Sequence, residues 1–393
     1  MRCSTVLENA LKKHIPLCPD FQLYHKLLGQ DAFERGVNLS ETPPVELPAA
    51  QESKSQTIAN RRLALAITIG RKSFETLVSR IEALYEELIS SDSGTVDSRQ
   101  SVAISSSRLK ELLKSSMIVS QSEKHVLQQE SIIGNMKLWG LLDMDDMKST
   151  LFIEFGCGKA YLTAKLVDLY PDVTDIVLLD NQKFKLVADG GLREKDLKRI
   201  RCDIADFNPH KLPQIGRCTE WLAYGKHLCG SATDFTLRCC ANFAKSGQKG
   251  AGSVGYAIAT CCHHLCSWDQ YVGKSFILSH GFSPEEFELM CYMCSWATCG
   301  HSSPAGMPKS ESTEKPDDAI PRTCEPQEWR PYITMDRSHR MQVGAKCKEI
   351  IDQGRVAWSR DQGFFPKIVD YIDKQVSEEN RLLLCRISDT SNH

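Results

Sequence analysis

The stretch Leu151-Phe-Ile-Glu-Phe-Gly-Cys-Gly-Lys-Ala-Tyr161 decides the fold of this 393-residue chain. An apolar run typical of a β-strand reaches Glu154, and Gly156 and Gly158 then bracket a tight turn. Apolar residues follow at helical spacing from Leu162 to Leu169. A strand, a glycine turn and a helix in this order open nucleotide-binding α/β folds. Taken alone, the pattern also fits an ordinary turn between a strand and a helix.

The residues around the two glycines distinguish between cofactors. A dinucleotide turn needs a third glycine three residues after the second, where this chain has Tyr161. Glu154 and Ala160 instead complete the pattern E-x-G-x-G-x-small. An acidic residue at that place suits S-adenosylmethionine, whose sulfonium and amino groups are cationic. We expect the methionine end of this methyl donor to be held by Glu154, Gly156 and Gly158, with Lys159 as a further donor-binding residue.

Two further acidic residues follow predicted strands of the same fold. Ile176–Asp180 is an apolar run that ends in an acid 24 residues after Gly156. In doubly wound folds a carboxylate there accepts both ribose hydroxyls of the ligand. Asp203, after the third strand, is placed to accept the adenine amino group, with Ile204 beside it. Together these positions favour a donor site over an ordinary turn.

Lys226 and His227 lie just past a fourth predicted strand, which begins at Trp221. The carboxyl ends of central strands line the crevice in which such folds bind ligand. Burial beside a cationic sulfonium lowers the pKa of a lysine, as a general base requires. The alternative is that Lys226 pairs with an acid and His227 only lines the adenine pocket.

A fifth strand, Val254–Thr260, runs into Cys261-Cys-His-His-Leu-Cys266. Successive strand residues face opposite ways, so Cys261 and His263 converge on one side, and Cys262 and His264 on the other. Four ligands therefore do not meet around one zinc ion unless the chain turns. We expect His263 and His264 to form a wall beside the substrate rather than a metal site.

Composition excludes several classes of protein. The formal net charge is −2, so any nucleic-acid binding needs a local basic patch. No apolar run approaches the roughly 18 residues that span a bilayer, and the N-terminus lacks the apolar core of a signal peptide. We therefore expect an intracellular chain, in the cytoplasm, the nucleus or both, whose 17 cysteines are reduced.

The remaining segments predict how the chain is divided. Residues 38–60 are polar and contain prolines, as in a linker, and residues 61–145 predict a helical extension. Residues 146–393 hold the α/β domain, with a low-complexity, disordered insertion at about 301–325. The charged run Arg193–Arg201 is interpreted as an RNA contact or a solvated helix face. Periodicity predicts helices at 58–89, 109–127, 234–243 and 344–355, and strands at 285–296 and 380–387.

Several long motifs in this chain resemble one family. They are Lys124-His-x-x-Gln-Gln-x-Ser-Ile-x-Gly-Asn135, Phe152-x-Glu-Phe-Gly-x-Gly-Lys159, Gly225-Lys-His-Leu-Cys-Gly-x-Ala-Thr-Asp234, Cys261-Cys-His-His-x-Cys-x-Trp268, Tyr271-Val-Gly-Lys274, Ser295-Trp-Ala-Thr-Cys-Gly300 and Ile351-Asp-Gln-Gly-Arg355. Their order and content are similar to the eukaryotic tRNA 2′-O-methyltransferases that act on the fourth nucleotide of the acceptor stem. The resemblance spans about residues 120–387.

This resemblance implies a class I methyltransferase with a seven-strand, doubly wound sheet. It implies transfer of a methyl group from S-adenosylmethionine to a ribose 2′-hydroxyl in certain tRNAs, which in the family are those for glycine, proline and histidine. We expect Lys226 or His227 next to that hydroxyl, and His263 or His264 on the facing wall. The partner is the tRNA acceptor stem, with no membrane and no obligate protein partner.

An acceptor stem exposes its 2′-hydroxyls in a shallow groove, so the enzyme must select one ribose by its distance along the duplex. Two basic pairs in the helical extension, Arg61-Arg62 and Arg71-Lys72, are candidates to contact the tRNA and set that distance. Two other classes stay open: a methyltransferase for protein or small-molecule substrates, and a non-catalytic tRNA-binding protein. A dehydrogenase is disfavoured by Tyr161.

Family members begin with two small zinc modules, the second of the Cys-His-His-Cys type. Residues 1–25 resemble the end of that second module, with His14 and Cys18 as its last two ligands. A zinc site needs two more ligands, and only Cys3 is nearby. The sequence fits a shortened chain and also a module that has been lost. His14 and Cys18 also fit a surface histidine and a core cysteine, so the sequence alone does not decide whether zinc is bound.

Overall fold

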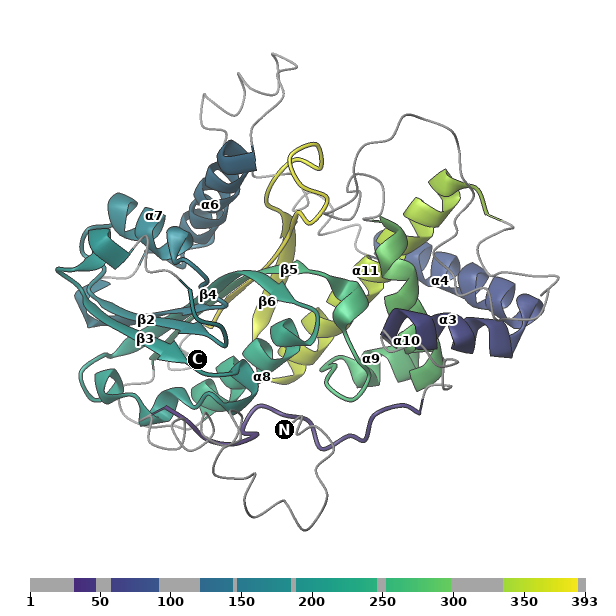
Figure 1. Ribbon diagram of the computed structural model, residues 1–393, viewed down its shortest axis with the longest axis horizontal. Coiled ribbons are helices and arrows are strands. Elements are labelled where there is room, and N and C mark those ends of the chain that lie inside the picture. The colour runs from purple at the N-terminus through teal and green to yellow at the C-terminus, as the bar shows by residue number, and fades with distance from the viewer. Residues whose placement is uncertain are drawn as a thin grey trace, which may run out of the picture. The chain divides into compact units, whose positions relative to one another are not determined.

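The computed structural model describes residues 32–46, 58–91, 121–143, 147–184, 189–245, 252–297 and 335–387 (Figure 1). The chain forms two compact units. The sheet unit contains Met1–Ser40, Gln100–Cys261 and Ser359–His393, and the helical unit contains Glu41–Arg99 and Cys262–Trp358. The chain therefore leaves the sheet unit after Cys261 and returns to it at Ser359.

The sheet unit is built on seven strands in the order β3-β2-β1-β4-β5-β7-β6. Parallel pairing joins the first five, whereas β7 is antiparallel to both β5 and β6. The seven-strand α/β sheet that the resemblance implies is confirmed, and the structure shows that the sheet is mixed. Its strands are β1 (Thr150–Phe155), β2 (Asp175–Asp180), β3 (Asp196–Arg201), β4 (Glu220–Cys229), β5 (Gly252–Cys261), β6 (Phe365–Asp370) and β7 (Arg381–Arg386).

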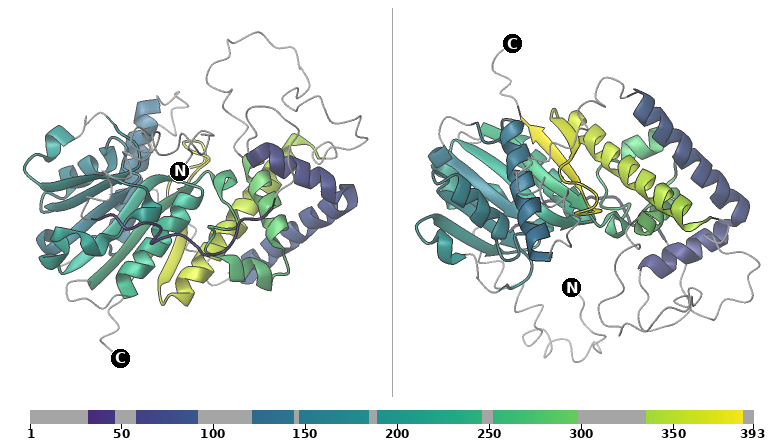
Figure 2. Two further views of the ribbon diagram at one scale, coloured as in Figure 1. Left: turned by 60° about the horizontal axis from the view of Figure 1, so that its bottom comes forward. Right: turned by 90° about the horizontal axis from the view of Figure 1, so that it is seen from above.

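Helices cover both faces of this sheet (Figures 1 and 2). On one face α6 (Gln121–Leu138) and α7 (Tyr161–Leu169) share a buried apolar core with alternate residues of the central strands. On the other face lies α8 (Ser231–Lys245), whose Phe243 ring packs 4.9 Å from that of Trp221 in β4. All six residues of β1 are buried, because a central parallel strand is covered on both sides.

The helical unit has its own core. It is formed by α3 (Ile58–Ile69), α4 (Arg71–Ser91), α9 (Lys274–Ser279), α10 (Pro284–Cys294) and most of α11 (Arg337–Asp361). Fully buried side chains include Phe74, Ile81, Phe287, Met290 and Ile350. Gly70, at φ +80°, separates α3 from α4. The helical spacing of apolar residues across 58–89 therefore corresponds to two helices.

Two predicted elements are corrected by the structure. The strand expected at 285–296 is helix α10: Ser283 caps it with a reciprocal capping box to Glu286, and Pro284 occupies its first turn. The charged run Arg193–Arg201 contains strand β3 instead of a helix face. The helices expected at 234–243 and 344–355 and the strand at 380–387 are confirmed by α8, α11 and β7.

Several expectations fall outside the described residues. These are the zinc ligands His14 and Cys18, the insertion at about 301–325 and nearly all of the helix at 109–127. The domain boundaries drawn from the sequence stay predictions. Within the described part of the chain, no helix combines the length and apolar character that crossing a membrane requires.

Candidate active site

The glycine turn follows β1 and holds three residues at positive φ: Gly156 (62°), Gly158 (51°) and Ala160 (60°). The Gly158 amide donates to Oδ2 of Asp180 over 2.9 Å, which ties the turn to the end of β2. A Cβ on Gly156 would lie 3.0 Å from the Leu228 side chain, whereas one on Gly158 would meet nothing within 4 Å. The open space that a ligand needs therefore lies at Gly158.

Glu154 is buried beneath this turn. Its Oε2 accepts from the Thr163 amide over 3.2 Å and also from the Thr163 hydroxyl, which contacts the hydroxyl of Tyr224 at 2.7 Å. Burial raises the pKa of Glu154 to about 7, against the opposing effect of the Thr163 hydrogen bonds. Because Thr163 lies in the first turn of α7, Glu154 fixes that helix to β1. Its contact with the methionine end of the donor stays a prediction.

Arg199 of β3 also holds the turn, although no sequence motif marks it. Its Nη1 donates to the carbonyl oxygen of Gly158 over 2.9 Å and lies 3.2 Å from Sγ of Cys157. This side chain was included in the charged run interpreted as RNA contact or solvated helix. It lies instead on a strand and points to the glycine turn. Alternation along β3 is the only sequence signal for that orientation.

The remaining expected donor residues lie at the same edge of the sheet. Asp180 is half-buried, and its Oδ1 accepts from the Gln182 amide over 2.9 Å. Asp203 is exposed and caps a short 3-10 helix by accepting from the Ala205 amide over 3.0 Å, whereas Ile204 is buried. Lys159 is exposed. Parallel strands place their carboxyl ends together, so these residues share one edge with Gly158.

Lys226, near the end of β4, is a buried lysine. Burial lowers its pKa to about 8, against the opposing effects of Glu154 and Cys261. Its Nζ lies 3.1 Å from Nδ1 of His125, which α6 brings from 101 residues away. Among the described residues its hydrogen-bond partner is therefore a histidine, not the acid of the alternative interpretation.

His227 is the extra residue of a β-bulge. The register pairs Lys226 with Ala259 and Leu228 with Thr260, so His227 is left over, and its φ is +71°. The bulge turns the side chain into solvent, where it lies edge-on to His125 with ring centroids 6.1 Å apart. We call His125, Lys226 and His227 the lysine cluster.

The lysine cluster lies against the glycine turn. The Cβ position of Gly156 is 3.9 Å from the carbonyl oxygen of His227, on the bulge. An amine of lowered pKa and two imidazoles are thus placed beside the turn expected to hold the donor. His125 was missed by sequence reasoning, although it stands in the motif Lys124–Asn135.

A known protein family matches the segment that holds most of this arrangement. A family model described as Methyltransferase TRM13 matches residues 127–386. The chain belongs to the TRM13 methyltransferase family. The matched segment includes the glycine turn, Lys226 and His227, and it begins two residues after His125.

Curated relatives of the TRM13 family are similar to this chain. The human protein named tRNA:m(4)X modification enzyme TRM13 homolog is 30% identical over 66% of this chain and 64% of its own length. The mouse protein of the same name is 26% identical over 96% of this chain and 83% of its own. The Saccharomyces cerevisiae tRNA:m(4)X modification enzyme TRM13 is 26% identical over 97% and 82%. The alignment with the human relative thus covers less than two thirds of that protein.

Within the family-matched segment, the chain turns directly after β5. Cys262 adopts a left-handed conformation at φ 51°, and a 3-10 helix, His263–Leu265, follows. The sequence prediction assumed that the strand continues through His264, with side chains on alternating faces. That prediction is wrong beyond Cys261. The physical reason is that a left-handed residue ends the pleat.

His263 and His264 belong to the helical unit. His263 is buried, with its Nε2 2.9 Å from Oδ2 of Asp352. Burial raises the pKa of Asp352, but His263 and then Arg355 outweigh it and hold that pKa well below its ordinary value. His264 is half-buried, and its carbonyl oxygen accepts from Arg62 over 2.6 Å. Whether either histidine faces the lysine cluster stays a prediction.

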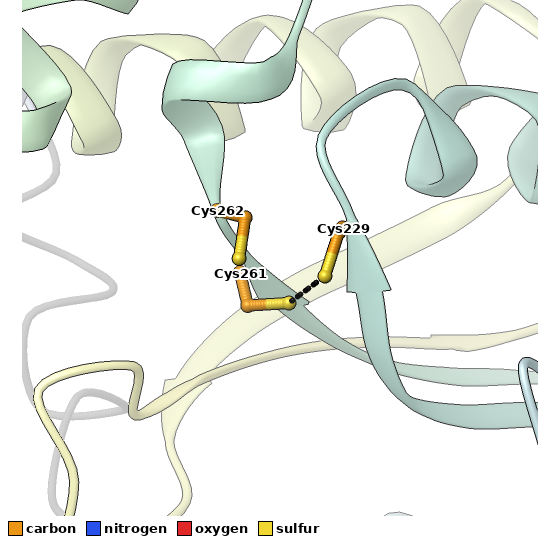
Figure 3. A group of neighbouring side chains, drawn as sticks. All are labelled: Cys229, Cys261 and Cys262. Carbon is orange, nitrogen blue, oxygen red and sulfur yellow. Dashed lines mark hydrogen bonds between the residues drawn. The ribbon is translucent and has the colours of Figure 1, made fainter. Parts of the chain in front are cut away.

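Three thiols gather where β4 and β5 end (Figure 3). Sγ of Cys229 lies 3.6 Å from Sγ of Cys261, and Cys262 follows in the chain with its sulfur within 4.8 Å of both. Thiolates at such separations can hold a soft metal ion. The zinc ligands considered from the sequence, His14 and Cys18, are not among the described residues.

Proposed function

We propose that this chain is an S-adenosylmethionine-dependent tRNA methyltransferase with a class I fold, active inside the cell. Its substrate is the 2′-hydroxyl of the fourth nucleotide of the acceptor stem. The observation that carries the proposal is the buried Lys226, with a pKa of about 8, beside the glycine turn and His125. Family membership and the printed names of the relatives, tRNA:m(4)X modification enzymes, support the substrate class.

The residues at the sheet edge fit the proposed methyl donor. Gly158 leaves open space for a ligand, and Asp180 offers a carboxylate at the end of β2 for the ribose hydroxyls. Asp203 and Ile204 are placed for the adenine. The bound donor would supply a methyl group on a cationic sulfonium. The strand order, with β7 inserted antiparallel between β5 and β6, supports the class I assignment.

The proton of the 2′-hydroxyl must leave as its oxygen attacks, and Lys226 is the proposed acceptor. With a pKa of about 8, about one tenth of the lysine is neutral at pH 7. An ammonium can only donate, so Nδ1 of His125 acts as acceptor once Lys226 is protonated. His125 is thus a positioning residue, and His227, exposed on the bulge, is available to the substrate.

One candidate tRNA contact is ruled out. Arg62 is 1% exposed and donates from Nε to Glu288 over 2.8 Å, so it cannot reach a phosphate. Arg71 is exposed and pairs with Glu75 one helical turn on, and Lys72 is exposed. The proposed recognition of distance along the acceptor stem therefore rests on Arg61, Arg71 and Lys72, without Arg62.

The proposed function is tested by incubating the full chain with methyl-labelled S-adenosylmethionine and unmodified tRNA transcripts. The expected result is label in tRNA, mapped to the ribose of nucleotide 4. Label only in protein or small molecules would support the alternative methyltransferase classes. tRNA binding without donor binding, as read by thermal shift, would support a non-catalytic tRNA-binding protein.

Gly158→Ala is expected to weaken donor binding. The new Cβ enters the space left open at Gly158 and meets no protein atom, so the added clash falls on the ligand. The measurement is the donor Kd by calorimetry, with a rise of at least about tenfold, or 1.4 kcal/mol. Gly363→Ala is the matched control, because Gly363 also has positive φ and open space but lies in the turn before β6. Equal donor affinity in both variants would contradict the assignment.

His125→Ala is expected to lower kcat by about tenfold and to shift its pH profile. Losing the acceptor at Nδ1 disfavours the protonated lysine, so the midpoint of the rise in kcat moves below about pH 8. His125→Asn can return an acceptor near the place of Nδ1 and should restore part of the rate. A drop in kcat with an unmoved midpoint would mean that His125 acts only in packing α6.

A further inference from the structure

Cys229 and Cys261 occupy directly paired positions on neighbouring strands. They are the last residues of β4 and β5, and the parallel register places one beside the other. Their sulfur atoms are 3.6 Å apart, and Figure 3 shows the two side chains pointing toward each other. Neither thiol has a role in the proposed transfer reaction.

Cys229 differs from the other cysteines that the structure describes. It is exposed and Cys262 is half-buried, whereas the other described cysteines are buried. Burial raises the pKa of Cys202 and Cys385 to about 12 and that of Cys218 to about 11, so these thiols stay protonated and unreactive. Cys229 is therefore the described thiol best placed to meet an oxidant, and Cys261 is beside it.

The backbone geometry suits a bond between the two sulfurs. Neighbouring strands are about 4.8 Å apart, which lies within the usual Cα separation of disulfides, about 4.4–6.8 Å. The sulfurs need to approach by only about 1.5 Å, since an S–S bond is about 2.05 Å long. Side-chain rotation at Cys229, which faces solvent, can supply part of this movement, and the end of β4 supplies the rest.

We propose that Cys229 and Cys261 form a redox-active pair that a peroxide converts to a disulfide. The Cys229 thiolate attacks one peroxide oxygen, the O–O bond breaks, and the leaving hydroxide takes up the proton that the thiol released, so that a sulfenic acid and water are formed. The Cys261 thiol then attacks the sulfenic sulfur, an S–S bond forms, and a second water leaves. Two electrons pass from the thiols to one hydrogen peroxide, and a dithiol reductant reverses the change.

Oxidation of this pair would act on the lysine cluster. Cys229 is two residues after the bulged His227 and three after Lys226, whose pKa already responds to Cys261. Closing the S–S bond pulls the end of β4 toward β5 and displaces the bulge. Displacements of about 1 Å in a catalytic arrangement can cost 100-fold in rate. This consequence rests on the proposed function, and it predicts a reversible loss of methyl transfer of at least about tenfold.

The test titrates the full reduced chain with hydrogen peroxide and reads intact mass and thiol alkylation. The expected result is the loss of two hydrogen masses, with protection of Cys229 and Cys261 from alkylation and reversal by dithiothreitol. Cys229→Ser should abolish the change, whereas Cys262→Ser, which alters the neighbouring thiol, should retain it. These readouts need no methyl transfer, so they separate this proposal from the proposed function.

Three outcomes would overturn the proposal. If Cys229→Ser still loses two hydrogen masses at the same peroxide concentration, the disulfide lies elsewhere. One equivalent of zinc retained by the wild type and lost in Cys229→Ser would make the thiols a metal site. A disulfide at this pair that leaves an active enzyme at full rate would remove its link to the lysine cluster.

Discussion

Lys226→Met lowers kcat for methyl transfer to tRNA by at least about 100-fold, because the variant keeps the buried alkyl chain but has no proton acceptor. Donor affinity stays within a few-fold, since the variant leaves the glycine turn, Asp180 and Asp203 in place. In the wild type, kcat rises with pH as Lys226 loses its proton, with a midpoint near its lowered pKa of about 8. Single-turnover kinetics across pH 6–10 would measure both effects.

Lys148→Met is the matched control for this experiment. Lys148 is largely exposed and pairs with the surface carboxylate of Asp172, so its loss should leave kcat unchanged. The assignment of Lys226 as the proton acceptor fails if Lys226→Met transfers methyl at a rate within tenfold of the wild type. It also fails if the pH midpoint of the wild type survives in the variant, because the midpoint would then belong to another group.

Arg62→Met is expected to destabilise the helical unit by about 3–5 kcal/mol, the usual cost of removing one partner from a buried ion pair. Arg62 lies on α3 and Glu288 on α10, with side-chain exposures of 1% and 4%. The variant leaves Glu288 charged in an apolar core, and it also removes donors to the carbonyl oxygens of His264 and Cys266. Unfolding by urea, followed by tryptophan fluorescence, would measure the loss.

The control for Arg62→Met is Arg71→Met, in the adjoining helix α4. Arg71 is exposed and its pair with Glu75 spans one turn, so the expected loss is below about 0.5 kcal/mol. The double variant Arg62→Met with Glu288→Met should recover much of the stability, since no uncompensated charge remains. A small effect of Arg62→Met alone would mean that the pair is hydrated in solution.

The central strands of the sheet could be delimited from the sequence, whereas edge strand β3 was expected only as a strand before Asp203 and edge strand β6 was not predicted. β1, β2, β4 and β5 are apolar runs that end in turns or polar residues, because both faces of a central strand are covered. The edge strands are β3 and β6, which carry exposed or half-exposed side chains at most positions. Their identity as strands follows from pairing with a neighbour, which a local pattern does not show.

The position of Lys226 could be predicted, but its partner could not. A residue at the end of a central strand lies in the ligand crevice of such folds by topology alone. His125 meets Lys226 only because α6 packs on the sheet, a contact between residues far apart in the sequence. For Arg62 a local signal did exist, since the apolar Leu65 and Ala66 follow it at the 3- and 4-residue spacing of one helix face, and all three are buried in the structure.

The insertion of β7 between β5 and β6 governs how this chain can fold during synthesis. Gly255 of β5 pairs with Arg386 of β7, so the edge of β5 stays open while more than a hundred further residues are made. Pairings between such distant residues form late, and an unpaired edge in the meantime attracts other strands. We therefore expect chains that terminate before β7 to aggregate, and refolding to be slow in spite of the local helices.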